Sequence, residues 1–179
     1  MPQSRFIPDA EFAPASIGAR VRIMTLLSFV AVVIVGTVVV VLMLQERRPP
    51  PWPVFVASGM APAVVAALWF TARIRRYRMV EAELHVELPF RTVRFPLQGL
   101  KEVTPDREAL RGARKMIGND GLGAISGRFR SKRLGRFHIY ATDAEHAVVL
   151  RWPDRCLVIS PQHPSLFVEM VRKRAGLSR

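Results

Sequence analysis

The sequence predicts two transmembrane α-helices followed by a mostly-β domain that ends in a helix. Two long runs carry no charged residue, at residues 23–44 and 54–72. From residue 81 onward, apolar and polar residues alternate, as on strands with one buried face. Charge is segregated too, because residues 73–179 hold 22 of the 27 Lys and Arg and 11 of the 14 Asp and Glu. These observations favour a membrane-attached basic domain over a single soluble fold.

The two apolar runs have the length of membrane spans. The first has 22 residues and the second 19, against the roughly 20 that cross a hydrocarbon layer of about 30 Å. The second contains Gly59 and Pro62, which membrane helices tolerate. A buried core helix or strand is the alternative, but core elements rarely stay uncharged for so long. A cleaved signal peptide is disfavoured because the first run is too long and lacks a small-residue cleavage site.

The link between the runs, residues 45–53, contains four prolines and is too short for a domain, so the spans are expected to form an antiparallel hairpin. Lys and Arg are enriched on the cytoplasmic side of membrane proteins. Two arginines lie in the link, whereas seven flank the hairpin on its terminal sides: Arg5, Arg20, Arg22, Arg73, Arg75, Arg76 and Arg78. This distribution predicts that both termini are cytoplasmic.

The predicted organisation has three parts. Residues 1–20, with three prolines, are expected to form a disordered cytoplasmic tail. Residues 21–79 form the hairpin and residues 80–179 the β domain. The four arginines after the second span, Arg73, Arg75, Arg76 and Arg78, would make a membrane-proximal basic collar.

The first half of the β domain is expected to hold three short strands and a helix. Residues 82–88 alternate strictly and end at Pro89, and residues 93–97 continue the alternation. A third strand is expected near residues 100–103. Thr104, Pro105 and Asp106 have the properties of a helix start. A short helix is therefore expected from residue 104 to Gly118.

The second half is expected to begin with a Gly-rich basic loop at residues 121–136. Strands are predicted at 137–141, 147–152 and 156–159, the last two forming a hairpin. The chain should close with a helix over residues 164–175. Its apolar positions have helical spacing, and Gly176 is a suitable residue to end it.

Several short stretches resemble a known family. They are Gly127–Phe129, Leu134–Phe137, Tyr140–Asp143, Ala147–Arg151 and Val158–Pro164 with Phe167. Over about residues 80–175 the sequence is similar to bacterial pleckstrin-homology-like (PH) domains, in the form that follows a pair of membrane spans. The resemblance implies a bent antiparallel β-sandwich or partly open barrel of seven strands, closed by a C-terminal helix. It implies a binding module for lipid head groups or proteins, without catalytic residues. Because bacteria generally lack phosphoinositides, lipid binding does not transfer directly.

The candidate binding site is a cluster of five cations in nine residues: Arg128, Arg130, Lys132, Arg133 and Arg136. Together with the collar, such a cluster can attract anionic lipid or an acidic partner. A solvated loop plus the ordinary positive-inside signal remains the alternative.

Other chemistries lack their motifs. The four histidines (His85, His138, His146 and His163) are scattered, and the single Cys156 is expected to be a small core residue. There is no Walker sequence, no G-x-S-x-G and no groove-reading nucleic-acid motif. We therefore expect no enzyme activity, cofactor, metal, small-molecule substrate or nucleic-acid partner.

The leading hypothesis is a non-enzymatic protein of the bacterial inner membrane that presents a cytoplasmic PH-like module to another membrane protein. Two alternatives remain open. One is a sensor of anionic lipid head groups, and the other is an accessory subunit of a membrane enzyme or transporter.

Overall fold

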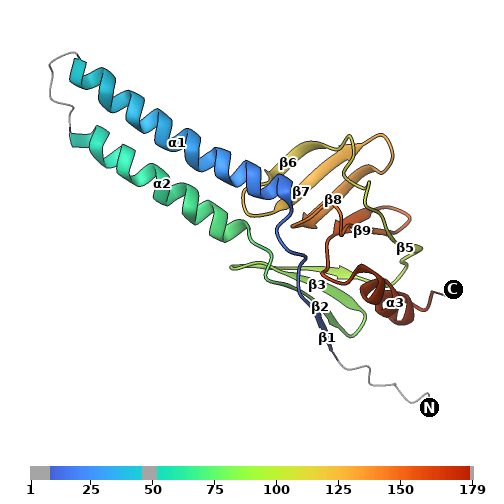
Figure 1. The fold of residues 1–179 in the computed structure, drawn as a ribbon. Coiled ribbons are helices and arrows are strands. Elements are labelled where there is room, and N and C mark those ends of the chain that lie inside the picture. Colours follow the sequence, from blue (N-terminus) through green and yellow to red (C-terminus); the bar gives the residue numbers. More distant parts are fainter. Residues whose placement is uncertain (1–8, 46–51, 178–179) are drawn as a thin grey trace.

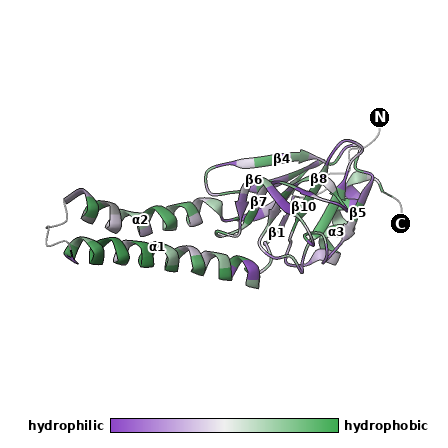
Figure 2. Ribbon diagram, turned by 90° about the horizontal axis from the view of Figure 1, so that it is seen from above, coloured by the Kyte–Doolittle hydropathy of each residue, from purple (hydrophilic) through white to green (hydrophobic). Residues whose placement is uncertain are grey.

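The computed structural model describes residues 9–45 and 52–177, and two helices project from one side of its β-rich domain (Figure 1). Helices α1 (Ala19–Gln45) and α2 (Trp52–Ala72) lie side by side, and both are long and apolar enough to cross a membrane. At 1.5 Å per residue, α2 is about 32 Å long, close to the thickness of a hydrocarbon layer. Figure 2 shows hydrophobic residues along both helices and hydrophilic ones concentrated in the domain.

The helix surfaces have the character expected in lipid. Leu26 is 64% exposed and Val35 is 62% exposed. The Thr37 hydroxyl donates to the Val33 carbonyl one turn back, so it needs no water. Where the helices meet, a Cβ added to Gly36 would lie 3.8 Å from the Cβ of Ser58. The helices therefore approach closely at a pair of small residues, and many of their large apolar side chains are exposed on the outside.

The first sheet has four antiparallel strands in the order β1-β2-β3-β4. They are β1 (Ala10–Phe12), β2 (Arg76–Val80), β3 (Glu83–Glu87) and β4 (Thr92–Pro96). Leu84 and Val86 on β3 are fully buried, while the glutamates beside them are partly exposed. The alternation predicted for residues 82–88 is thus confirmed. Strand β2 begins at Arg76, four residues before residue 80, where the sequence placed the start of the domain.

The N-terminal segment is folded, so the prediction of a disordered tail is wrong for residues 9–20. Phe12 pairs with Tyr77 of β2 and packs edge-on against Phe167, with ring centroids 5.1 Å apart. The Ala15 amide donates to the Ser160 carbonyl at 2.8 Å. The sequence did not predict β1 because a strand of three residues is too short to show alternation. Its partner, β2, also lies far away in the sequence. Residues 1–8 of the predicted tail lie outside the described residues.

The second sheet has six strands in the order β5-β9-β10-β8-β7-β6. They are β5 (Glu102–Pro105), β6 (Arg114–Asp120), β7 (Ile125–Ser131), β8 (Gly135–Ala141), β9 (Val148–Arg151) and β10 (Cys156–Ile159). The predicted hairpin of β9 and β10 is confirmed. The described residues thus form ten strands where the resemblance implied seven, and the β8–β10 pair is parallel in an otherwise antiparallel arrangement.

The helix expected between residues 104 and 118 is absent. Residues 102–105 form β5, residues 106–113 form turns, and β6 begins at Arg114. Asp106 does stabilise a local turn, because its carboxylate accepts the Glu108 amide at 3.0 Å. Of the apolar residues in this stretch, Ala109 and Leu110 are buried in the core, whereas Met116 is 49% exposed and Ile117 is 70% exposed. The helical spacing of apolar residues in this stretch was therefore coincidental.

The six-stranded sheet contributes to a hydrophobic core on each of its faces. Its first core lies toward the four-stranded sheet and helix α3 (Pro164–Ala175), and includes Tyr77, Leu84, Leu157, Ile159, Phe167 and Val171. Its second core lies on the other face and includes Val21, Leu110, Phe129, Phe137, Ile139 and Val158. Helix α3 has the predicted bounds, and Gly176 ends it with a φ of 68°.

A buried polar network joins the N-terminal segment to both sheets. The Tyr77 hydroxyl donates to the Tyr140 carbonyl at 2.7 Å and accepts the Ser160 amide at 3.2 Å. The Thr142 hydroxyl donates to the Ala15 carbonyl at 2.8 Å. Burial raises the pKa of Tyr77 to about 12. These hydrogen bonds connect the first sheet to the second sheet, and the second sheet to the N-terminal segment.

Candidate functional site

The predicted basic loop is largely a pair of strands, so that prediction is wrong for most of residues 121–136. Residues 125–131 form β7, and β8 starts at Gly135. Gly118 pairs with Gly127 across β6 and β7, and a Cβ added to Gly118 would lie 2.1 Å from the Ser126 carbonyl oxygen. Such close contact requires glycine. Because β7 contains Gly127 and two arginines, its sequence lacks the alternation of apolar and polar residues that would have predicted a strand.

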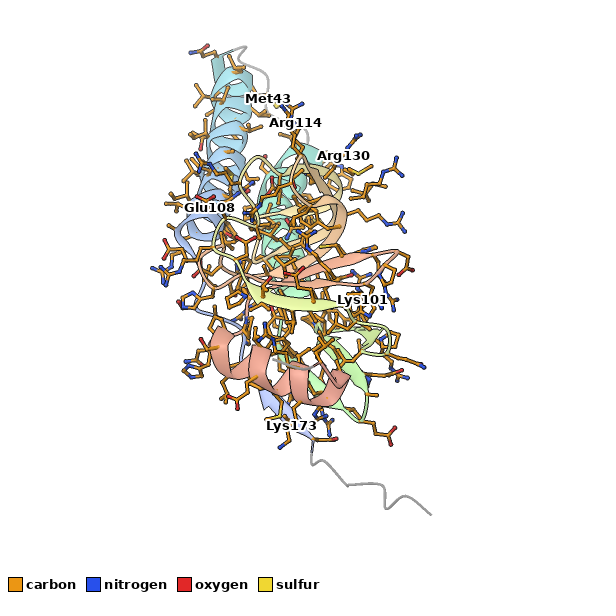
Figure 3. All side chains as sticks on the ribbon, turned by 90° about the vertical axis from the view of Figure 1, so that its right-hand side faces the viewer. Met43, Lys101, Glu108, Arg114, Arg130 and Lys173 are labelled. Carbon is orange, nitrogen blue, oxygen red and sulfur yellow. The ribbon has the colours of Figure 1, made fainter. Side chains whose placement is uncertain are left out.

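Strand pairing gathers four arginines on one sheet face. Arg130 lies directly across from Arg114 on β6 and from Arg136 on β8, which makes a row over three adjacent strands. Arg128 is two residues from Arg130 on the same side of β7. Figure 3 shows Arg114 and Arg130 extending from the same part of the domain. We call Arg114, Arg128, Arg130 and Arg136 the basic face.

The basic face continues the sheet surface that forms the first core. Arg128 pairs with His138, and His138 pairs with the buried Leu157 of β10. Paired residues point to the same side of a sheet. Beyond β8, the four-stranded sheet no longer covers this surface, and Arg128 and Arg130 are exposed. The same face of the six-stranded sheet is therefore buried at β10 and exposed and positively charged at β7.

The described residues do not compensate the charge of the basic face. Among residues 9–45 and 52–177, no carboxylate lies within ion-pair distance of its four arginines. Like charges directly opposite on neighbouring strands destabilise a sheet. The pKa of His138 is lowered, first by burial and then by the positive charges of Arg128 and Arg155. The surface is therefore suited to an anion that this part of the chain does not supply.

The other predicted cluster residues lie elsewhere. Lys132 and Arg133 occupy the β7–β8 turn, and Arg133 forms an ion pair with Asp106. The Arg133 hydrogen bond holds the pKa of Asp106 below its ordinary value. Arg114 was missed because the sequence placed it on a helix. Its position in the row depends on a bulge between Lys115 and Ile117, which has no sequence signal.

The predicted collar divides into two environments. Arg76 forms ion pairs with Glu11 at 3.0 Å and Glu87 at 2.9 Å, and Arg78 with Asp9 at 2.9 Å. These charges are compensated within the first sheet. Arg73 instead stacks over the Trp69 ring, 4.7 Å from its centroid, at the end of α2. Arg75 is exposed between them, and of the four arginines only Arg76 and Arg78 have carboxylate partners among the described residues.

The β6–β7 turn is seated against the helices. The Thr25 hydroxyl on α1 donates to the Gly121 carbonyl at 3.0 Å and accepts the Gly123 amide at 3.2 Å. Arg20 forms an ion pair with Asp120 at 2.8 Å. A Cβ added to Gly123 would lie 2.7 Å from the Trp69 carbonyl oxygen on α2. The turn thus links the hairpin and the domain directly.

The histidines do not assemble a metal site in the part of the chain that the structure describes, where no three His, Cys, Asp or Glu side chains come together suitably. His146 and His163 line a hollow of about 630 Å³ beside α3, and the His146 Nδ1 lies 2.6 Å from the Asp143 carboxylate. Cys156 is buried, and burial raises its pKa to about 11. A thiol with such a pKa is protonated at neutral pH and is a poor nucleophile.

The family model for the bacterial PH domain matches residues 75–175. This match covers more than half of the chain, so the protein belongs to the bacterial PH domain family. The matched region begins directly before β2 and ends with α3. The family is generally non-catalytic, and PH domains commonly bind lipids or proteins. Comparisons with curated proteins and with solved structures found no match.

Proposed function

We propose that this protein is a non-enzymatic membrane protein whose basic face binds an acidic segment of another membrane protein. In this proposal α1 and α2 cross the bacterial inner membrane, and both termini lie in the cytoplasm. The row of Arg114, Arg130 and Arg136 carries the proposal, because three like charges are aligned across adjacent strands without a carboxylate from residues 9–45 or 52–177. An acidic partner would relieve their repulsion and would be guided to the surface by charge.

The position of the row favours a protein over the surrounding lipid. Arg130 lies seven residues beyond Gly123, which contacts α2. At about 3.3 Å per residue this is about 23 Å of extended chain, and β6 and β7 lead away from the helix ends (Figure 1). Attraction to an anionic membrane surface falls off within a Debye length of about 8 Å. Head groups at the helix ends would therefore contribute little at Arg130.

The test is affinity purification of the tagged full-length protein in mild detergent, followed by mass spectrometry at low and high salt. A stoichiometric partner should copurify with the wild type at low salt and be depleted with Arg130→Glu/Arg136→Glu. The matched control is Lys101→Glu/Lys173→Glu, which reverses two charges on other parts of the domain (Figure 3). A partner kept by the double variant, or a preparation without any partner, would contradict the proposal.

A lipid-sensing function is the second candidate. It is supported by Arg73, which stacks on Trp69 at the end of α2, where the head groups of a bilayer would lie. If lipid alone is recognised, the purified protein should lack a protein partner and retain anionic lipid.

A further inference from the structure

A groove of about 530 Å³ lies where the helices meet the domain. It is formed by the end of α2, the turn between β3 and β4, and the β6–β7 turn with its flanking strands. The lining residues are Leu68, Thr71, Ala72, Leu88, Phe90, Arg91, Gly118, Asn119, Leu122 and Ser126. The groove thus combines a membrane helix with the membrane-facing end of the basic sheet.

One side of the groove is apolar and continues the outer surface of α2. Leu68 is 53% exposed, and Phe90 is 77% exposed at the tip of the β3–β4 turn. The Phe90 ring lies 6.4 Å from the ring of Phe70 on α2, in an edge-on arrangement. An aromatic side chain that is so exposed in water is costly, but it is well placed at the interface of a bilayer. An acyl chain that contacts α2 can therefore continue into the groove.

The other side of the groove offers polar groups that the described chain does not use. Ser126 is only 8% exposed, yet its hydroxyl has no hydrogen-bond partner among residues 9–45 and 52–177. Arg91 is exposed, with no carboxylate of the described residues within ion-pair distance. Asn119, by contrast, is occupied, since its side-chain amide donates to the Leu122 and Ala124 carbonyls. A hydroxyl and a guanidinium are suitable donors to a phosphate.

We propose that this groove binds one phospholipid with an anionic head group, taken from the leaflet on the domain's side. Its acyl chain would pack on Leu68 and Phe90, and its phosphate would accept hydrogen bonds from Arg91 and Ser126. The positive charge of Arg91, which is exposed and lines the groove, would favour an anionic head group over a zwitterionic one. The inference rests on the membrane placement proposed above, but not on the acidic partner.

The experiment is native mass spectrometry of the full-length protein in mild detergent, titrated with phosphatidylglycerol or with phosphatidylcholine. The wild type should bind one phosphatidylglycerol and bind phosphatidylcholine more weakly. Arg91→Glu should weaken phosphatidylglycerol binding about tenfold, because it reverses a charge close to the phosphate. Phe90→Ser should weaken both lipids by removing apolar contact.

Two control variants match these changes outside the groove. Arg94→Glu reverses an exposed charge on β4, and Leu166→Ser removes a side chain that is 52% exposed on α3. Both should bind lipid as the wild type does. Equal affinity for the two lipids, or unchanged binding in both Arg91→Glu and Phe90→Ser, would overturn the proposal.

The outcomes separate this inference from the proposed function. Arg130→Glu/Arg136→Glu should lose the protein partner and keep the lipid, while Phe90→Ser should do the reverse. Extraction of cell membranes with alkaline carbonate tests the shared assumption. Release of the protein into the soluble fraction would contradict the membrane placement, and with it both proposals.

Discussion

The two ends of the β6–β7 hairpin differ in how completely their polar and charged groups are paired. At the end near the helices, Asp120 pairs with Arg20, and Asn119 bonds three backbone groups of the turn. At the other end, Arg114 and Arg130 are exposed, with no carboxylate partner in the described part of the chain. The β6–β7 hairpin thus has a fixed end beside the helices, which orients the domain. Its other end, at Arg114 and Arg130, is open and available for binding.

The largest effect is expected from a Cβ at the fixed end. Gly123 and Gly99 have nearly the same φ, 75° and 74°, but only Gly123 closely contacts another element. Gly99→Ala should lower the free energy of unfolding by about 1–2 kcal/mol through backbone strain alone. Gly123→Ala should cost about 1–3 kcal/mol more, because the new Cβ meets the Trp69 carbonyl. Thermal denaturation in detergent measures the difference, and equal costs would mean that the turn is not seated on α2.

A smaller difference is expected between the two turns that flank β7. Asn119 supports the fixed turn through three hydrogen bonds, whereas Ser131 at the open end accepts one, from the Leu134 amide at 3.0 Å. Asn119→Ala should therefore cost about 2–3 kcal/mol, and Ser131→Ala about 1 kcal/mol. The measurement is denaturant unfolding of the same detergent preparation. A larger loss for Ser131→Ala would reverse the assignment of the fixed and open ends.

Removal of arginines from the open end should leave stability almost unchanged. Arg130→Ala and Arg136→Ala are expected to change the free energy of unfolding by less than about 0.5 kcal/mol, or to raise it slightly by relieving repulsion. Arg78→Ala is the contrast, since Arg78 has carboxylate partners at its surface and should cost about 0.2–1 kcal/mol. A clear loss of stability in Arg130→Ala would show that the basic face has an internal structural role.

The smallest effect concerns the pH dependence contributed by His138. Its pKa is lowered in the folded protein, so the unfolded state binds the proton at higher pH. The resulting stability is complete above the ordinary histidine pKa of about 6.5 and is lost as the pH falls through the lowered value. His138→Gln should reduce this dependence. In NMR titration, Arg128→Ala should raise the His138 pKa, and an unchanged value would mean that Arg128 does not act on it.

Local patterns in the sequence were sufficient for several elements. The charge-free runs predicted α1 and α2, strict alternation predicted β3 and β4, and the spacing of Phe167 and Val171 predicted α3 with its bounds. Each of these signals depends on residues close together in the chain. The family resemblance also came from such short stretches, and the match to residues 75–175 confirms it.

The sequence alone determined, through hydrophobic length and periodicity, that an apolar hairpin precedes a basic, mostly-β domain. The tertiary structure decided which arginines act together. It paired Arg76 and Arg78 with carboxylates of the N-terminal segment, and it aligned Arg114 with Arg130 and Arg136. It also brought Phe90 and Ser126 into one groove. These relations depend on strand register and on contacts between distant segments, where a shift of one residue would move a side chain to the opposite face of the sheet.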